Sequence, residues 1–120
     1  MKKIITLIVV IALGFSASSL TLTERLNQLP GVKAEAKTPA PGFTESFTLW
    51  ISQPLDHQHP EKGNFTQRAF LSHRGFKKTM VMTTEGYSAD YANNAYFEEE
   101  LAALLQSNQV VVEHRYFSQS

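Results

Sequence analysis

The sequence predicts an α/β fold in which antiparallel strands lead into a parallel sheet. Two segments in the middle of the chain alternate apolar and polar residues with a period of two, which is typical of antiparallel strands. A short apolar segment, an amphipathic segment and a run of three valines then follow in that order. A strand, a helix and a second strand in succession form the crossover that joins parallel neighbours.

The first 19 residues have the pattern of a secretory signal peptide. Lys2 and Lys3 precede an apolar run over residues 4–15, and small residues follow it up to Ser19, as a signal and its cleavage site require. The apolar run is too short to cross a bilayer, which takes about 20 residues. We therefore expect a secreted or periplasmic protein with no membrane anchor after cleavage; a buried helix or an uncleaved anchor is the alternative.

A short helix and a linker are predicted over residues 20–42. Leucines alternate with polar residues over 20–29, and a Pro-Gly pair ends this amphipathic pattern. Residues 33–41 are rich in Ala, Lys, Thr and Pro, a composition typical of an exposed linker. The folded domain is therefore expected to cover residues 43–120.

Three strands are predicted next along the chain. Residues 43–53 and 64–73 alternate apolar and polar side chains, and the polar segment 56–63 between them contains Pro and Gly. These two strands are expected to pair in antiparallel fashion. The third strand, over 79–84, is short and apolar at its centre, so it is expected to be buried.

A loop over residues 85–94, a helix over 95–106 and a strand over 109–113 complete the prediction. Three glutamates at 98–100 lie near the amino end of the helix, where they suit its dipole, and they are interpreted as a helix start and not as a metal or acid-binding site. The valines at 110–112 are typical of a strand covered on both faces. Such a sheet needs further neighbours, so the chain is interpreted as an incomplete α/β domain.

Composition excludes several classes of function. Without the two signal lysines, nine basic residues stand against 11 acidic ones, and no clustered basic face is predicted, so a nucleic acid partner is not expected. The sequence contains no cysteine, which excludes disulfides, thiolate nucleophiles and cysteine-bound zinc. His57 and His59 lack a third ligand at suitable spacing and are interpreted as surface residues, so neither a metal nor a cofactor is expected.

Residues 86–90 read Gly-Tyr-Ser-Ala-Asp, which is close to the G-x-S-x-G nucleophile elbow. Asp90 stands where the elbow needs a second glycine, because the following helix approaches closely there. Ser88 is therefore interpreted as an ordinary loop serine, and its action as a nucleophile is the lesser alternative.

Ionisable residues follow the last predicted strand. Glu113, His114, Arg115 and Tyr116 lie at the carboxyl end of this strand, where α/β sheets bind ligands. Burial of Glu113 and Arg115 requires partners of opposite charge or hydrogen bonds. A structural ion-pair network and direct participation in a site are both open interpretations.

Several segments resemble those of a family of secreted serine peptidases in order and spacing. They are Gln53 to His57, Asn64 to Arg68, Glu85 with Gly86, and the final VVEHRYFSQS from Val111 to Ser120. Over residues 43–120 the chain resembles the amino-terminal part of the secreted bacterial tripeptidyl aminopeptidases, and more distantly prolyl carboxypeptidase and dipeptidyl peptidase II.

This resemblance implies an α/β-hydrolase fold with a Ser, Asp, His triad that releases tripeptides from the free amino ends of peptides or proteins. Chain order in that fold places the whole triad beyond Ser120. No catalytic residue is therefore expected in this chain, and His114 is not the catalytic histidine.

The resemblance also implies roles for a few residues. Glu85, Gly86 and Tyr87 match the loop after the third strand of the fold, which contributes a backbone N–H to the oxyanion hole. Arg115 and Tyr116 match the segment that lines the site beside this loop.

A carboxylate can hold the terminal ammonium of a substrate, and Glu85 or Glu113 is our hypothesis for this role. Phe117 and Ser118 depart from the Tyr and Gly that are common in prolyl carboxypeptidases, so substrate preference is open. A secreted binding domain without catalysis, and an esterase or lipase on the same fold, are the alternative functions.

Overall fold

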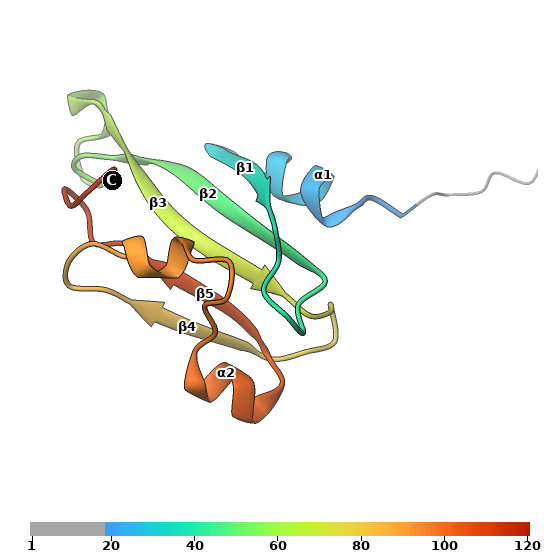
Figure 1. Cartoon of the computed structure of the whole chain (residues 1–120). Coiled ribbons are helices and arrows are strands. Elements are labelled where there is room, and N and C mark those ends of the chain that lie inside the picture. The colour runs from blue at the N-terminus through green and yellow to red at the C-terminus, as the bar shows by residue number, and fades with distance from the viewer. Residues whose placement is uncertain (1–18) are drawn as a thin grey trace, which may run out of the picture.

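The computed structural model describes residues 19–120, which form a five-stranded sheet with short helices around it (Figure 1). The predicted signal peptide lies outside the described residues apart from Ser19. Among the residues described, no helix is long and apolar enough to cross a membrane. The elements are α1 (Leu22–Asn27), β1 (Val32–Lys37), β2 (Glu45–Pro54), β3 (Asn64–His73), β4 (Met80–Thr84), α2 (Glu100–Leu105) and β5 (Asn108–Val112), with 3-10 turns η1 (Pro60–Lys62) and η2 (Asp90–Asn93).

Helix α1 confirms the predicted amphipathic helix in a shorter form. Thr21 caps it: the Thr21 hydroxyl oxygen accepts a hydrogen bond from the Glu24 N–H (3.2 Å), and the Glu24 carboxylate accepts one from the Thr21 N–H (2.7 Å). This reciprocal pair is a capping box. Leu22 and Leu26, one turn apart, pack against the sheet.

Residues 32–37 form strand β1, so the prediction of an exposed linker over 33–41 is wrong for this part. β1 pairs with β2 in antiparallel register, with Ala34 opposite Leu49, and Ala34 packs against the core. The strand escaped prediction because it is the edge of the sheet. Edge strands often carry charged residues, which discourage pairing with other chains. The sheet therefore begins before Phe43.

The strand order is β1-β2-β3-β5-β4. β2 pairs with β3, and β3 with β5, in antiparallel register, whereas β4 and β5 are parallel. The predicted antiparallel pair and the predicted parallel crossover are thus both confirmed, and the domain is of the α/β class with a mixed sheet. β5 is inserted between β3 and β4, so it has a neighbour on each side.

The predicted helix over 95–106 is reduced to α2, and η2 replaces part of the predicted loop. The buried Gln109 side chain explains the late helix start, because it accepts a hydrogen bond from the Glu99 N–H (2.8 Å) and donates one to the Phe97 carbonyl (3.3 Å). These bonds hold residues 97–99 in a non-helical conformation. Glu99 is the N-cap and Glu100 lies in the first turn, which confirms that the glutamates start a helix.

β4 is not buried, and that prediction is wrong. Met80 and Met82 are 50% and 62% exposed. The reason is position, because β4 is the second edge strand of the sheet and pairs with β5 alone among the described strands. α2 likewise exposes Leu101, Leu104 and Leu105.

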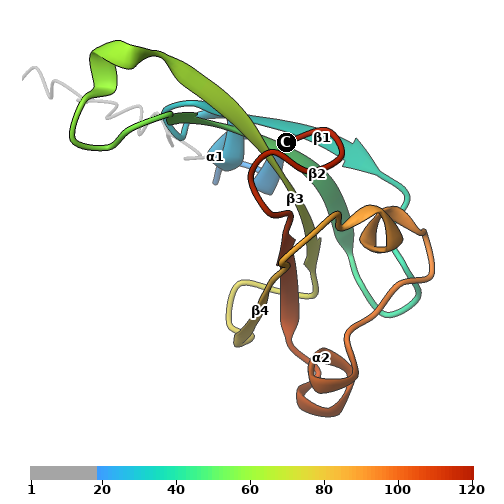
Figure 2. The same cartoon turned by 90° about the vertical axis from the view of Figure 1, so that its left-hand side faces the viewer.

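Alternate residues of the central strands face opposite sides of the sheet and divide the core into two clusters. α1 covers one side and the orange turn η2 lies over the other (Figure 2). The α1 side holds Phe47, Leu49, Ala69 and Leu71, and the η2 side holds Phe70, Ala89, Ala92 and Val111. Phe70 is paired with Val111 in the register. By the same period of two, Arg68 and Glu113 fall on the η2 side.

Candidate functional site

The loop after β4 and the segment after β5 lie side by side at the carboxyl ends of these two parallel strands (Figure 1). The Glu85 N–H donates to the Val112 carbonyl (2.9 Å), and the His114 N–H donates to the Tyr87 carbonyl (3.1 Å). The two groups of residues that the sequence singled out are therefore brought together by the parallel pairing.

Two backbone amides of this loop are free to bind an external group. Gly86 is exposed, and no atom lies within 4 Å of the position that a Cβ would take. Within residues 19–120, the N–H groups of Gly86 and Tyr87 donate to no protein acceptor. Both amides are therefore left without an acceptor in the part of the chain that the structure describes.

Glu85 is half-buried and fixed through one carboxylate oxygen. Its Oε1 accepts a hydrogen bond from the Tyr91 hydroxyl. Burial and this contact raise the pKa of Tyr91, so the hydroxyl stays protonated and remains a donor. The other oxygen, Oε2, has no hydrogen-bond donor among the described residues.

Arg115 and Tyr116 pack mainly against the hairpin formed by β2 and β3. The Arg115 guanidinium contacts both the Phe65 and the Tyr116 rings, 4.6 and 4.7 Å from their centres. Its Nη2 donates to the Leu55 carbonyl (3.1 Å) and to the Tyr116 hydroxyl oxygen (2.5 Å). These two residues thus connect the segment after β5 to the hairpin.

The side chains that contact the loop after β4 come from other residues of the same segment. The Tyr87 ring packs edge-on against Phe117, with ring centres 5.3 Å apart, and Phe117 packs against His114 at 5.4 Å. Tyr87 is 72% exposed. An aromatic surface made of Tyr87, His114 and Phe117 therefore lies beside the free amides.

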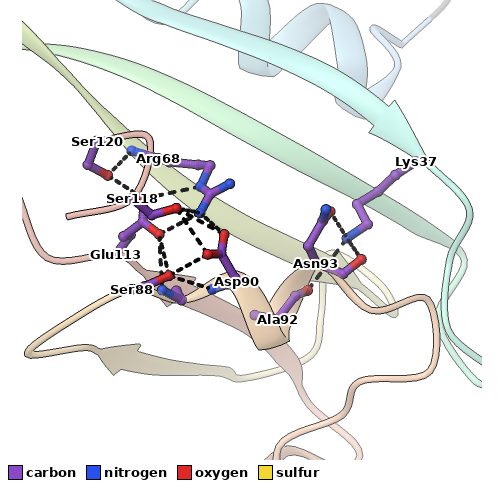
Figure 3. A network of polar contacts seen from close by, with 10 residues as sticks. Lys37, Arg68, Ser88, Asp90, Ala92, Asn93, Glu113, Ser118 and Ser120 are labelled. Carbon is purple, nitrogen blue, oxygen red and sulfur yellow. Dashed lines mark hydrogen bonds and ion pairs between the residues drawn. The ribbon is translucent and has the colours of Figure 1, made fainter.

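Glu113 is fully buried and paired with Arg68 of β3 (Figure 3). Arg68 Nη2 donates to Oε1 (2.5 Å) and Arg68 Nε donates to Oε2 (3.1 Å). The Ala89 N–H (3.0 Å) and the Ser120 hydroxyl (2.8 Å) also donate to this carboxylate. Both oxygens of this carboxylate are therefore occupied by protein donors. Of the two interpretations left open by the sequence, the arrangement favours a structural ion-pair network for Glu113 over direct participation in a site.

Asp90 completes the network from the loop side. Arg68 Nη2 also donates to Asp90 Oδ1, and the hydroxyls of Ser88 (2.8 Å) and Ser118 (3.0 Å) donate to Asp90 Oδ2. Ser88 thus contacts carboxylates, and no histidine of residues 19–120 contacts its hydroxyl. The arrangement favours an ordinary loop serine, and it shows why position 90 carries an aspartate instead of a glycine.

The network keeps all three of its charges. The hydrogen bonds from Arg68, Ser88 and Ser118 lower the pKa of Asp90. Burial alone would raise the pKa of Glu113, but the hydrogen bonds from Arg68, Ala89 and Ser120 outweigh burial and lower it. Burial opposes the charge of Arg68 too, yet its bonds to the two carboxylates raise its pKa.

The predicted surface histidines take no part in this site. His59 Nδ1 lies 3.3 Å from the Glu61 carboxylate in the β2–β3 hairpin, and both side chains are exposed. In the part of the chain that the structure describes, no three His, Asp or Glu side chains are grouped to hold a metal ion.

The sequence prediction assigned no role to Arg68, Asp90, Ser118 or Ser120. One signal for Arg68 was present, because a strand that buries its neighbours cannot bury an arginine without a carboxylate partner. Glu113 presented the same problem in another strand. Each residue therefore signalled the need for a partner of opposite charge, but the sequence did not show that they pair with each other.

Comparison with known proteins assigns the family. The family model of the PS-10 peptidases S37 matches residues 16–120. The chain belongs to the peptidase S37 family. It is also 29% identical over 109 residues to a prolyl tri/tetrapeptidyl aminopeptidase from Streptomyces mobaraensis. These findings confirm the resemblance to the tripeptidyl aminopeptidases. The alignment covers 91% of this S37 chain but 22% of the relative, so the chain spans about a fifth of the relative's length.

Proposed function

We propose that this chain is the amino-terminal part of a secreted serine aminopeptidase with an α/β-hydrolase fold, which releases tripeptides from the free amino ends of its substrates. The observation that carries the proposal is the peptidase S37 match across the two segments that meet at the carboxyl ends of β4 and β5. Export is supported by the signal-like pattern of the first 19 residues.

The catalytic Ser, Asp and His are contributed by protein beyond Ser120 in this proposal, in the chain order of α/β-hydrolases. The serine attacks the scissile carbonyl, and negative charge develops on its oxygen in the tetrahedral intermediate. N–H donors placed about 2.7–3.1 Å from that oxygen stabilise it. The free amides of Gly86 and Tyr87 are this chain's candidates for such donors.

An aminopeptidase also has to bind the substrate's terminal ammonium. A carboxylate is the natural partner, since charge-assisted hydrogen bonds are stronger than neutral ones. Glu113 is enclosed by four donor groups, whereas Glu85 is half-buried and keeps Oε2 free. We assign ammonium binding to Glu85.

The substitution Glu85→Gln tests this assignment in the complete protein encoded by the gene. We expect KM for a chromogenic tripeptide with a free amino end to rise about tenfold or more, because a hydrogen bond to a charged group contributes about 1.5–3 kcal/mol. The value of kcat should change little. Steady-state kinetics measures both.

The matched control is Glu100→Gln, which removes an exposed carboxylate on α2. It should leave KM unchanged. An unaltered KM for Glu85→Gln would remove Glu85 from ammonium binding. Cleavage of the N-acetylated tripeptide at the same rate as the free one would contradict the aminopeptidase function itself.

A further inference from the structure

We propose that Arg68 is a positioning residue that fixes the loop carrying the free amides against the segment after β5. The inference rests on the proposed function, because it concerns the same site. Arg68 contacts neither Gly86 nor Tyr87 directly; it acts through Asp90 and Glu113.

The guanidinium of Arg68 joins three segments that are distant in sequence (Figure 3). It donates to Asp90 at the start of η2, to Glu113 at the end of β5, and to the Ser118 hydroxyl in the following turn (3.2 Å). The Arg68 backbone N–H adds a bond to the Ser120 hydroxyl (2.9 Å). Candidate site residues lie just before Asp90 and between Glu113 and Ser118.

Arg68 is held on a rigid element. β3 is paired on both sides, with β2 and with β5, and the Arg68 side chain is only 4% exposed. Its guanidinium lies 5.0 Å from the centre of the Phe70 ring. A site supported from a sheet interior is held more accurately than one that depends on its own loops.

The loop after β4 is attached to the β5 segment near the free amides. The Glu85 N–H and the Tyr87 carbonyl each make one bond to the backbone of that segment, and the Ala89 N–H donates to Glu113 Oε1 (3.0 Å). The far end of η2 is held separately, by Lys37 of β1 through the Asn93 carbonyl (2.9 Å). The near end, next to the amides, is held by two carboxylates: Asp90, and Glu113, which accepts the Ala89 N–H. Arg68 binds both carboxylates, so it helps to set where the amides lie.

Arginine is required here because one side chain has to donate in several directions at once. Nε and Nη2 bind the two oxygens of Glu113, and Nη2 also reaches Asp90. A lysine ammonium keeps the charge but lacks the planar fork. The substitution Arg68→Lys therefore preserves charge and disturbs geometry.

The test compares Arg68→Lys with Arg74→Lys in the complete protein. Arg74 is a matched control: its side chain is 8% exposed, it pairs with Glu98, and it donates to the carbonyls of Gly42 (2.7 Å) and Ser107 (3.0 Å). Arg74 directly follows the carboxyl end of β3, whereas Arg68 lies in the middle of the strand. Both variants should lose stability, measured as Tm.

We expect Arg68→Lys to lower kcat about tenfold to 100-fold with KM within about threefold, since a small misplacement of catalytic groups can cost about 10² in rate. Arg74→Lys should keep kcat within about twofold. A merely structural role would lower Tm for both arginines without this difference in kcat. Equal kcat values for the two variants would overturn the inference.

If Arg68→Lys does not fold, Asp90→Asn provides the test. The Asp90 side chain is 61% exposed, and the asparagine side chain has the same shape as the aspartate that it replaces. We expect kcat to fall at least about threefold with Tm nearly unchanged; an unchanged kcat would overturn the inference. An inactive wild-type protein would overturn the proposed function as well, whereas an active wild type with unaffected variants would overturn this inference alone.

Discussion

The substitution Gly86→Pro is expected to lower kcat about 10²- to 10³-fold, the usual effect of losing one oxyanion-hole donor. Proline removes the N–H that the Gly86 amide offers to the substrate oxygen. The residue before a proline has to be extended, and Glu85 directly follows strand β4 with its N–H bonded to the Val112 carbonyl. Single-turnover kinetics on the complete protein would measure the effect of the substitution on chemistry.

The matched control is Gly86→Ala, which retains the N–H. No atom lies within 4 Å of the added Cβ, so we expect kcat and Tm close to the wild-type values. Equal losses in the two variants would mean that space at this position matters and the amide does not. Full activity of Gly86→Pro would contradict the proposed role of this amide.

The substitution Glu113→Gln is expected to reduce the free energy of unfolding by about 3 kcal/mol, the lower part of the range for breaking a buried ion pair. After the substitution, Arg68 would still pair with Asp90 but would have lost its second anionic partner. The neutral amide would also place a donor NH2 group against the guanidinium. Urea unfolding at pH 7 measures the loss.

The acid dependence of unfolding gives a second readout of Glu113. Its pKa is lowered in the folded state, so its contribution is complete above the unfolded value of about 4.3 and is lost as the pH falls through the folded value. The variant should therefore lose less stability than wild type below about pH 4. Glu35→Gln, which removes an exposed partner of Lys33, is the control and should behave like wild type; an equal response of both variants would contradict the buried pair.

Alternation of side chains was enough to predict the long strands of this sheet. β2 buries Phe47 and Leu49 on one face, β3 buries residues on both faces, and the valines of β5 suit a strand with neighbours on both sides. β1 was missed because an edge strand needs few apolar residues, and Ala34 contributes little hydrophobic signal. The burial of β4 was wrong for a related reason, since sequence pattern does not show which strand lies at an edge.

The meeting of the two site segments could be predicted, whereas the network below them could not. Glu85 and His114 follow strands joined by a crossover, and parallel neighbours end at the same edge of a sheet. Arg68 reaches Glu113 only because β5 is inserted between β3 and β4. That strand order is a property of the tertiary structure and has no local signature in the sequence.

The coding DNA beyond the codon for Ser120 provides the most direct test of the central claim, that this chain is the amino-terminal part of a serine aminopeptidase. We predict an open reading frame that continues through a further strand into a Gly-x-Ser-x-Gly segment, with an aspartate and then a histidine of the triad later in the frame. A stop codon directly after Ser120, found in independent clones, would contradict the claim.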